Sequence, residues 1–291
     1  MSIAVIVTDR NTDLLCQLIQ AQLPEVNIQQ WPAIRAPEAV RMAVLWKHPP
    51  GVTQDMSNLK CVVSMGAGLD HIIADTTIAE DIKYHRIVTN ALKQNMAQYV
   101  LQHILNDHRH QKDYQKQQTQ KHWQVLENGE NIPVVGLLGL GELGCFVADR
   151  CAELGLRIMA WTAKQTHPEY PCFHGKSGLR LVCQASQYLV VLLPLNDDTF
   201  GIINKETLSW CGSDTVLIQV GRGAHVVEAD LKSALDLGVI KHAVLDVFNE
   251  EPLPTNHPFW EHEKITITPH CSARSDIKES AAHIIKFYNQ L

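Results

Sequence analysis

The sequence lacks several patterns that would place it in large classes of protein. Its eight cysteines include no C-x-x-C pair, so no redox motif or paired zinc-site spacing is present. Most of them lie among apolar residues, which predicts reduced thiols that pack as small hydrophobic side chains. Clusters of Lys and Arg are also missing, and the formal net charge is −6. A nucleic-acid partner is not expected, because phosphate neutralisation needs a basic face.

Long hydrophobic runs are absent as well. The first apolar run, MSIAVIVT, is followed at once by Asp9 and Arg10 and is too short for a secretion signal or a membrane span. We therefore expect no membrane association and a cytoplasmic location. The spacing of His103, His108 and His110 does not place all three on one helical face, so no metal site is expected.

Short, β-branched apolar runs alternate instead with helical or turn-rich stretches. This alternation is typical of parallel βαβ units, and 291 residues with 45% hydrophobic content suffice for about two domains. The expected strands are residues 3–8, 43–46, 61–64, 87–89, 134–138, 157–161, 188–193, 216–220, 242–247 and 265–268. A long helix is expected to open near Gln94. Its polar continuation, 108–123, is predicted to be solvent-exposed, disordered or an arm on a partner subunit.

The final segment, SDIKESAAHIIKFYNQL, carries apolar residues at helical spacing. A helix formed after the preceding domain has closed must bury this stripe elsewhere. We therefore predict a discontinuous substrate domain, residues 1–97 and 272–291. The inserted domain, 98–271, is predicted to be doubly wound and to bind a dinucleotide.

The hexapeptide GLGELG is a G-x-G-x-x-G placed between an apolar strand and an amphipathic helix. In this context Gly139 permits the tight turn, Gly141 lets a pyrophosphate approach the backbone, and Gly144 lets helix and strand pack closely. The helix N-terminus offers free N–H groups to the phosphates. The predicted cofactor contacts here are Gly139, Leu140, Gly141, Glu142, Leu143 and Gly144.

The end of the next strand, IMAWTAKQTH, lacks the acid that would accept from an adenosine 2′-OH. Thr162 stands in that place, and Lys164 can reach a 2′-phosphate. NADPH is therefore expected to be preferred over NADH. Lys164 could equally be an ordinary surface lysine.

Three later strands end in polar residues that would emerge at the carboxyl edge of the sheet, where open α/β folds bind ligands. They are QVGRG with Arg222, LDVFNEEPLP with Asp246 and Glu251, and ITITPHCSA with His270. Taken singly, each has a structural explanation, such as a strand-end ion pair, a solvated loop acid or a satisfied histidine. Cys271 beside His270 has no evident orienting partner for a nucleophilic role.

These motifs resemble those of the D-isomer-specific 2-hydroxyacid dehydrogenases, and the 2-oxo acid substrate which that resemblance implies would explain why these residue types occur together. A guanidinium at Arg222 can grip the carboxylate and polarise the adjacent ketone, which a lysine could not do with the same fork. The glycines on either side of Arg222 would let the main chain run close to a nicotinamide. Hydride transfer leaves charge on the carbonyl oxygen, and His270 is the natural proton donor.

Together with MGAGLDHI (65–72) and LLPLNDDTFGIIN (192–204), these motifs resemble the D-isomer-specific 2-hydroxyacid dehydrogenases and follow that family's order over most of the chain. The resemblance implies an α/β fold with two Rossmann-like domains, of which the substrate domain is flavodoxin-like. It implies that Glu251, rather than Glu250, orients His270, and that Asp246 lies near the nicotinamide carboxamide.

The resemblance also implies substrate contacts in the first domain. The backbone N–H groups of Ala67 and Gly68 would bind the substrate carboxylate, and Trp46 would line the substrate pocket unless it is a core tryptophan. The implied cofactor contacts are completed by Pro194, Val220, Gly221, Arg222, Asp246 and His270.

The expected function is that of an NADPH-dependent reductase of small 2-oxo acids, converting glyoxylate or hydroxypyruvate to glycolate or glycerate. One alternative is an NADH-linked D-2-hydroxyacid dehydrogenase with another substrate. A second is a cofactor-sensing binding protein on the same fold. The resemblance also implies a homodimer, formed through the helix and arm after residue 98.

Overall fold

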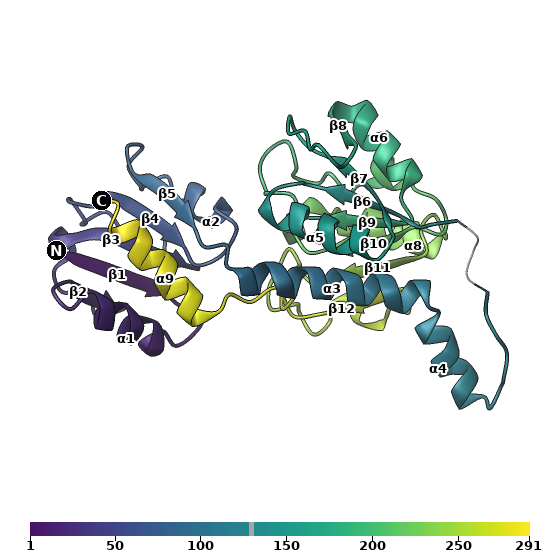
Figure 1. Ribbon diagram of the computed structural model, residues 1–291, viewed down its shortest axis with the longest axis horizontal. Coiled ribbons are helices and arrows are strands. Elements are labelled where there is room, and N and C mark those ends of the chain that lie inside the picture. The colour runs from purple at the N-terminus through teal and green to yellow at the C-terminus, as the bar shows by residue number, and fades with distance from the viewer. Residues whose placement is uncertain (128–130) are drawn as a thin grey trace. The chain divides into compact units, whose positions relative to one another are not determined.

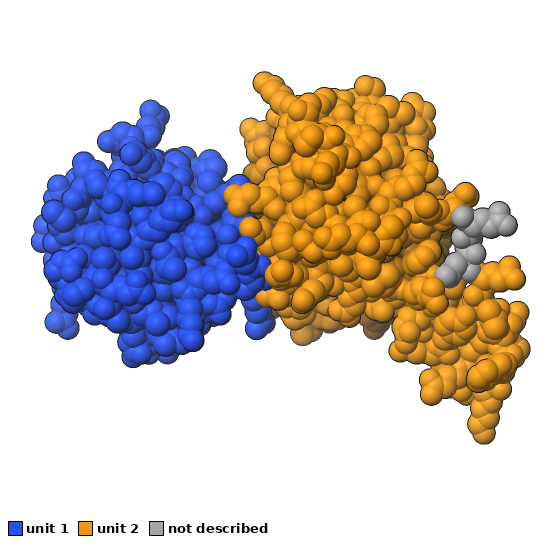
Figure 2. Space-filling model, in the orientation of Figure 1, with its two compact units in different colours: residues 1–92, 274–291 blue, residues 93–273 orange. Residues whose placement is uncertain are grey.

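The computed structural model describes residues 1–127 and 131–291 (Figure 1). The chain divides into two compact units, Met1–Leu92 with Arg274–Leu291 and Lys93–Ala273 (Figure 2). Each unit contains one parallel β-sheet with its own buried core. The first unit is assembled from both ends of the chain.

The first unit has a five-stranded sheet in the order β2-β1-β3-β4-β5, which is the flavodoxin-like order. Its strands are β1 (Ser2–Val7), β2 (Asn27–Gln30), β3 (Val40–Trp46), β4 (Cys61–Ser64) and β5 (Lys83–Arg86). Its helices are α1 (Asp13–Gln22), the 3₁₀ helix η1 (Pro37–Ala39), α2 (Asp70–Ile73) and α9 (Ile277–Tyr288). Helices α1 and α9 pack together on one face of the sheet (Figure 1), where Ala281, Ile284 and Ile285 of α9 join the core.

The edge strand β5 lies four residues before the strand expected at 87–89. Its sequence, KYHR, is mostly exposed, and an edge strand needs no apolar face to pair through its backbone. Ile87 is fully buried just after the strand, and its N–H donates to the carbonyl of Ser64 at 3.1 Å. The apolar residues expected to form the strand therefore lie just after it and pack in the core. The backbone pairing of β5 with β4 is formed by the polar residues before them.

The second unit has a seven-stranded parallel sheet in the order β12-β11-β10-β9-β6-β7-β8. From β6 the chain winds outward first to β7 and β8 and then, in the other direction, through β9 to β12, which is the doubly wound pattern. The strands are β6 (Val134–Leu138), β7 (Arg157–Trp161), β8 (Cys172–Phe173), β9 (Tyr188–Val191), β10 (Val216–Gln219), β11 (His242–Leu245) and β12 (Ile265–Ile267). The two-residue β8 was not expected from the sequence.

Helices cover both faces of this sheet. The long helix α3 and α5 bury their apolar residues on one face, and α6, α7 and α8 cover the other. The helices are α3 (Asn90–His108), α4 (Gln111–Thr119), α5 (Glu142–Glu153), α6 (Gly175–Ala185), α7 (Lys205–Leu208) and α8 (Glu228–Asp236), with 3₁₀ helices η2 (Gly223–His225) and η3 (Pro258–Glu261). Helix α4 lies in the polar segment and buries none of its residues. Among the described residues, no helix has both the length and the apolar character needed to cross a membrane.

Candidate active site and cofactor cradle

The candidate site lies at the carboxyl edge of the seven-stranded sheet. Strands β6 and β9 are adjacent, and the chain leaves them in opposite directions, which makes their junction the topological switch point where such sheets bind ligands. The glycine loop follows β6. The loops with Arg222, Glu251 and His270 follow the neighbouring strands β10, β11 and β12.

The glycine loop has one position open to a ligand. A Cβ on Gly144 would lie 2.3 Å from the carbonyl oxygen of Gly139, so the close contact of helix α5 with the turn requires glycine there. A Cβ on Gly141 would meet no protein atom within 4 Å. Gly141 is the N-cap of α5, and no side chain caps that helix among the described residues. Space beside a helix N-terminus that no side chain caps fits a bound pyrophosphate.

The turn after β7 is held by the hydroxyl of Thr162. Thr162 is buried, and its Oγ1 donates to the carbonyl of Gln165 at 2.6 Å. His174 Nδ1 lies 2.9 Å from the carbonyl oxygen of Thr162. The hydroxyl therefore fixes the turn, and the exposed side chain of Lys164 is left as the cationic group of this segment.

The Arg222 loop packs tightly against its own chain. A Cβ on Gly221 would lie 2.9 Å from the ring of His225, and one on Gly223 would lie 2.0 Å from the backbone of Phe248. Protein packing therefore requires glycine at both positions, and the approach of a nicotinamide to this stretch of main chain stays a prediction. Arg222 itself is half-buried, and its Nη1 donates to the carbonyl of Gly221 at 2.9 Å.

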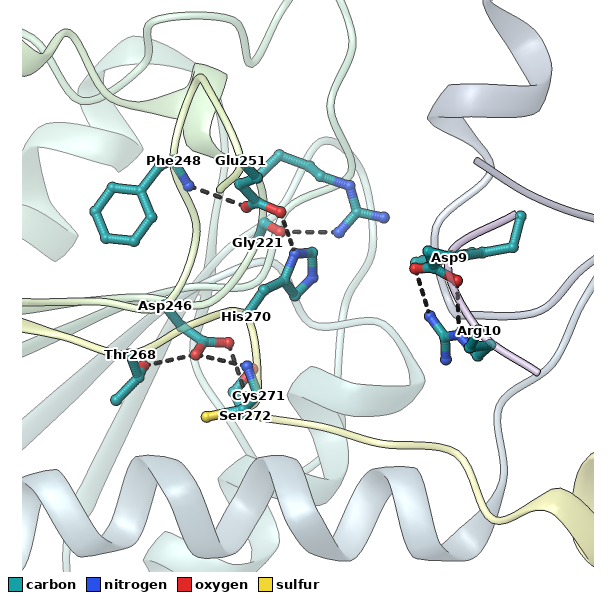
Figure 3. A network of polar contacts seen from close by, with 12 residues as sticks. Asp9, Arg10, Gly221, Asp246, Phe248, Glu251, Thr268, His270, Cys271 and Ser272 are labelled. Carbon is teal, nitrogen blue, oxygen red and sulfur yellow. Dashed lines mark hydrogen bonds and ion pairs between the residues drawn. The ribbon is translucent and has the colours of Figure 1, made fainter. Parts of the chain in front are cut away.

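His270 and Glu251 form the predicted pair. His270 Nδ1 lies 2.8 Å from Glu251 Oε2, and Glu251 Oε1 accepts the backbone N–H of Phe248 at 3.1 Å (Figure 3). Because Nδ1 donates to the carboxylate, Nε2 is the nitrogen left to exchange a proton with another molecule. His270 has a left-handed backbone with φ of 50°, and its N–H donates to the carbonyl of Asp246 at 2.8 Å.

Asp246 is fully buried and anchors the loop that carries His270. Its Oδ1 accepts the hydroxyl of Thr268 at 2.6 Å and the N–H of Cys271 at 2.9 Å. Its Oδ2 accepts the N–H of Ser272 at 2.9 Å (Figure 3). The contact of Asp246 with a nicotinamide carboxamide stays a prediction, whereas its role in shaping the His270 loop follows from these three bonds.

The substrate contacts expected in the first unit lie at the carboxyl edge of its own sheet. A Cβ on Gly66 would lie 2.7 Å from the ring of Trp46, so the indole packs against the loop that contains Ala67 and Gly68. The indole Nε1 of Trp46 donates to Asp9 Oδ2 at 3.1 Å. Trp46 is thus half-buried and not enclosed in the core, and its part in substrate binding stays a prediction, as do those of Ala67 and Gly68.

Four residues near the site were missed from the sequence. Gln219 and His225 bond to the Arg222 loop, and Tyr99 and Thr268 bond in series to Asp246. Gln219 could have been identified as a candidate from the sequence, since it interrupts the otherwise apolar run VLIQV. Tyr99 could not, because it comes from a helix far away in the sequence.

Comparison with known proteins identifies the family of this chain. A family model described as "D-isomer specific 2-hydroxyacid dehydrogenase, NAD binding domain" matches residues 101–272. The chain is 36% identical over 263 residues to glyoxylate/hydroxypyruvate reductase A of Yersinia enterocolitica, covering 88% of this chain and 83% of the relative. Solved structures are also similar to this chain, and two of them are described next.

One of these is a D-isomer specific 2-hydroxyacid dehydrogenase of Xanthobacter autotrophicus in complex with NADPH and MES. It is 30% identical, with a TM-score of 0.93 over 99% of this chain and 94% of that one. The other is an NADPH-dependent glyoxylate/hydroxypyruvate reductase of Sinorhizobium meliloti in complex with NADP and sulfate. It is 28% identical, with a TM-score of 0.88 over 100% of this chain and 96% of that one.

The fold and the matched segment define an NAD(P)-dependent oxidoreductase with Rossmann-like domains. Within that class, the chain belongs to the D-isomer-specific 2-hydroxyacid dehydrogenase family. The α/β fold and the resemblance predicted from the sequence are thereby confirmed.

Proposed function

We propose that the protein is an NADPH-dependent reductase of small 2-oxo acids such as glyoxylate and hydroxypyruvate. The observation that carries the proposal is the His270–Glu251 hydrogen bond of 2.8 Å, formed at the same sheet edge as the Arg222 loop. An acid and a guanidinium are the two groups that ketone reduction beside a carboxylate requires.

Arg222 binds the substrate in this proposal. Its planar fork pairs with the carboxylate and also polarises the neighbouring ketone, which makes C2 a better hydride acceptor. Reduced nicotinamide, when bound, supplies that hydride. Arg222 Nη1 already donates to the carbonyl of Gly221 in its own loop, and this bond restricts the orientation of the guanidinium.

His270 supplies the proton. Glu251 holds Nδ1, so Nε2 is the atom that gives its proton to the developing alkoxide oxygen. Glu251 is itself held by the N–H of Phe248. The orientation of the imidazole is thus determined by a chain of two hydrogen bonds that starts at the backbone.

NADPH is the proposed cofactor. The open space at Gly141 and the uncapped N-terminus of α5 suit the pyrophosphate. No Asp or Glu comes directly after β7, and the exposed Lys164 can pair with a 2′-phosphate. The two solved relatives described above hold NADPH or NADP, which supports the same choice.

The test is oxidation of NADPH and of NADH, followed at 340 nm, against a panel of 2-oxo acids. We expect turnover of glyoxylate or hydroxypyruvate with NADPH, and loss of that turnover in Arg222→Ala and His270→Ala. Tight cofactor binding without turnover of any acid would refute the reductase and favour a cofactor-sensing protein. Equal turnover with both cofactors would refute the role of Lys164.

The proposed partner is a second copy of the chain, bound through α3 after residue 98 and through the arm that follows this helix. Trp123 and Val125 in this arm are 98% and 77% exposed, and burial of such side chains favours association. Sedimentation of the wild type and of Trp123→Ser tests this. A dimer that Trp123→Ser weakens is expected, and a monomeric wild type would refute it.

A further inference from the structure

We propose that Gln219 and His225 are positioning residues that fix the backbone of Arg222, and through it the guanidinium that binds the 2-oxo acid. The inference rests on the proposed function for the role of Arg222. The contacts on which it depends lie wholly within the second unit.

The side chains of Gln219 and His225 enclose the two peptide units around Arg222. Gln219 Oε1 accepts the N–H of Gly221 at 3.0 Å, and Gln219 Nε2 donates to the carbonyl of Arg222 at 3.1 Å. His225 Nδ1 accepts the N–H of Arg222 at 3.0 Å. The remaining carbonyl, that of Gly221, accepts from Arg222 Nη1. Every backbone polar group of Gly221 and Arg222 therefore has a partner.

His225 also ties this loop to the neighbouring strand. Since Nδ1 accepts a hydrogen bond, the ring proton is on Nε2, which lies 3.3 Å from the carbonyl oxygen of Pro194 after β9. The ring packs on Gly221, where a Cβ would come within 2.9 Å. One imidazole thus joins the loop after β10 to the loop after β9.

Burial makes these bonds matter. Gln219 and His225 are both 0% exposed, and a buried polar side chain is costly unless its hydrogen bonds are made. An apolar side chain would serve the core at least as well at either position. We therefore infer that these two polar residues are present because their hydrogen bonds hold the Arg222 loop in its conformation.

The variants that test the positioning role keep the approximate volume of each side chain and remove its hydrogen bonds to the Arg222 loop. His225→Leu and Gln219→Met lose both contacts of each side chain, whereas His225→Asn keeps an acceptor where Nδ1 lies. We expect the first two to raise KM for glyoxylate at least ~10-fold, as loss of a buried hydrogen bond implies. We expect KM for NADPH to change less than about twofold and His225→Asn to recover most of the glyoxylate affinity, since its side chain restores the bond to Arg222.

Thr215→Val is the matched control. Thr215 is 1% exposed at the other end of β10, and its hydroxyl donates to the carbonyl of Ser186 at 2.8 Å. This variant should lower the midpoint of urea unfolding to an extent similar to Gln219→Met and leave KM for glyoxylate unchanged. A glyoxylate KM that rises equally in Thr215→Val, or that stays at the wild-type value in Gln219→Met and His225→Leu, would overturn the proposal.

Hydrogen–deuterium exchange separates this inference from the proposed function. Exchange of the peptide that contains Gly221 and Arg222 should be faster in Gln219→Met than in the wild type, without any substrate. Faster exchange in a protein whose wild type reduces no 2-oxo acid would refute the proposed function alone. Unchanged exchange would refute the positioning role, whatever the activity.

Discussion

The phenol oxygen of Tyr99 lies 2.6 Å from the hydroxyl oxygen of Thr268. The Thr268 hydroxyl gives its single proton to Asp246, so Tyr99 must be the donor in this contact. Burial raises the pKa of Tyr99 above its ordinary value, which keeps the phenol protonated. Helix α3 is thereby connected through two hydroxyl groups to the carboxylate that shapes the His270 loop.

Tyr99→Phe should remove the hydrogen bond from Tyr99 to Thr268 with a small loss of stability. We expect the free energy of unfolding to fall by about 1 kcal/mol, the net value of one hydrogen bond. Asp246→Asn should lower the free energy of unfolding further, by about 2–3 kcal/mol, because its amide N–H would face one of the three groups that donate to Asp246. The value of kcat should also fall further than in Tyr99→Phe. Urea unfolding and steady-state rates measure both. Equal effects of the two variants would contradict this role of Asp246.

Gly141→Ala and Gly144→Ala separate cofactor binding from packing. A Cβ at Gly141 meets only open space, whereas one at Gly144 clashes with the carbonyl of Gly139. Gly141→Ala should leave the unfolding temperature almost unchanged and weaken NADPH binding at least ~10-fold, because the methyl occupies the pyrophosphate position. Gly144→Ala should lower the unfolding temperature. Tight NADPH binding by Gly141→Ala, measured by calorimetry, would place the pyrophosphate elsewhere.

Lys164→Ala should change the choice of cofactor. Loss of a charge-assisted bond to the 2′-phosphate corresponds to ~10-fold or more in KM for NADPH. The KM for NADH should stay the same, since NADH has no such phosphate. Lys176→Ala is a suitable control, because Lys176 is exposed and already paired with Glu206 at 2.9 Å. A parallel loss with both cofactors would show that Lys164 acts on something other than the 2′-phosphate.

The stability of the second unit should fall in mild acid because of His242. Burial and the nearby Lys112 ammonium lower the pKa of His242 from 6.5 to about 4. The folded state therefore binds fewer protons than the unfolded state in this range. The stabilisation from a neutral His242 is fully present above pH 6.5 and is lost as the pH falls toward 4.

The size of this effect is at most about 3.5 kcal/mol, from ~1.4 kcal/mol for each pH unit by which the pKa is displaced. Urea unfolding at pH 7.5 and pH 5 should show a smaller loss on acidification for His242→Gln than for the wild type. His122→Gln, which alters an exposed histidine, should behave like the wild type. An identical loss in His242→Gln would assign the acid sensitivity to other groups.

The strands of the second unit were predictable to within two residues at their ends because buried parallel strands are continuous apolar runs. Strands β2, β5 and β8 were not, since they are short or largely exposed. Edge strands are stabilised by backbone pairing, which leaves little trace in the choice of side chains.

Some residues of the candidate site could likewise be predicted from the sequence, and others could not. Arg222, Glu251 and His270 follow strands in regular succession, so their convergence at one sheet edge follows from the topology alone. Tyr99 and His225 could not be assigned from their positions, because their roles depend on hydrogen bonds between segments that only the packed chain brings together. The contacts of the two glycines beside Arg222 with His225 and Phe248 were not predicted from the sequence, whereas their expected role in the approach of a ligand stays a prediction.

Helix α9 supplies core residues to the unit formed by residues 1–92. During synthesis on the ribosome, that helix emerges only after all of residues 93–273 have been made. All the residues of the seven-stranded unit are thus made before α9, whereas the five-stranded unit has α1 alone on that face of its sheet until α9 is available. The order of folding is therefore expected to run opposite to the order in which the two units begin.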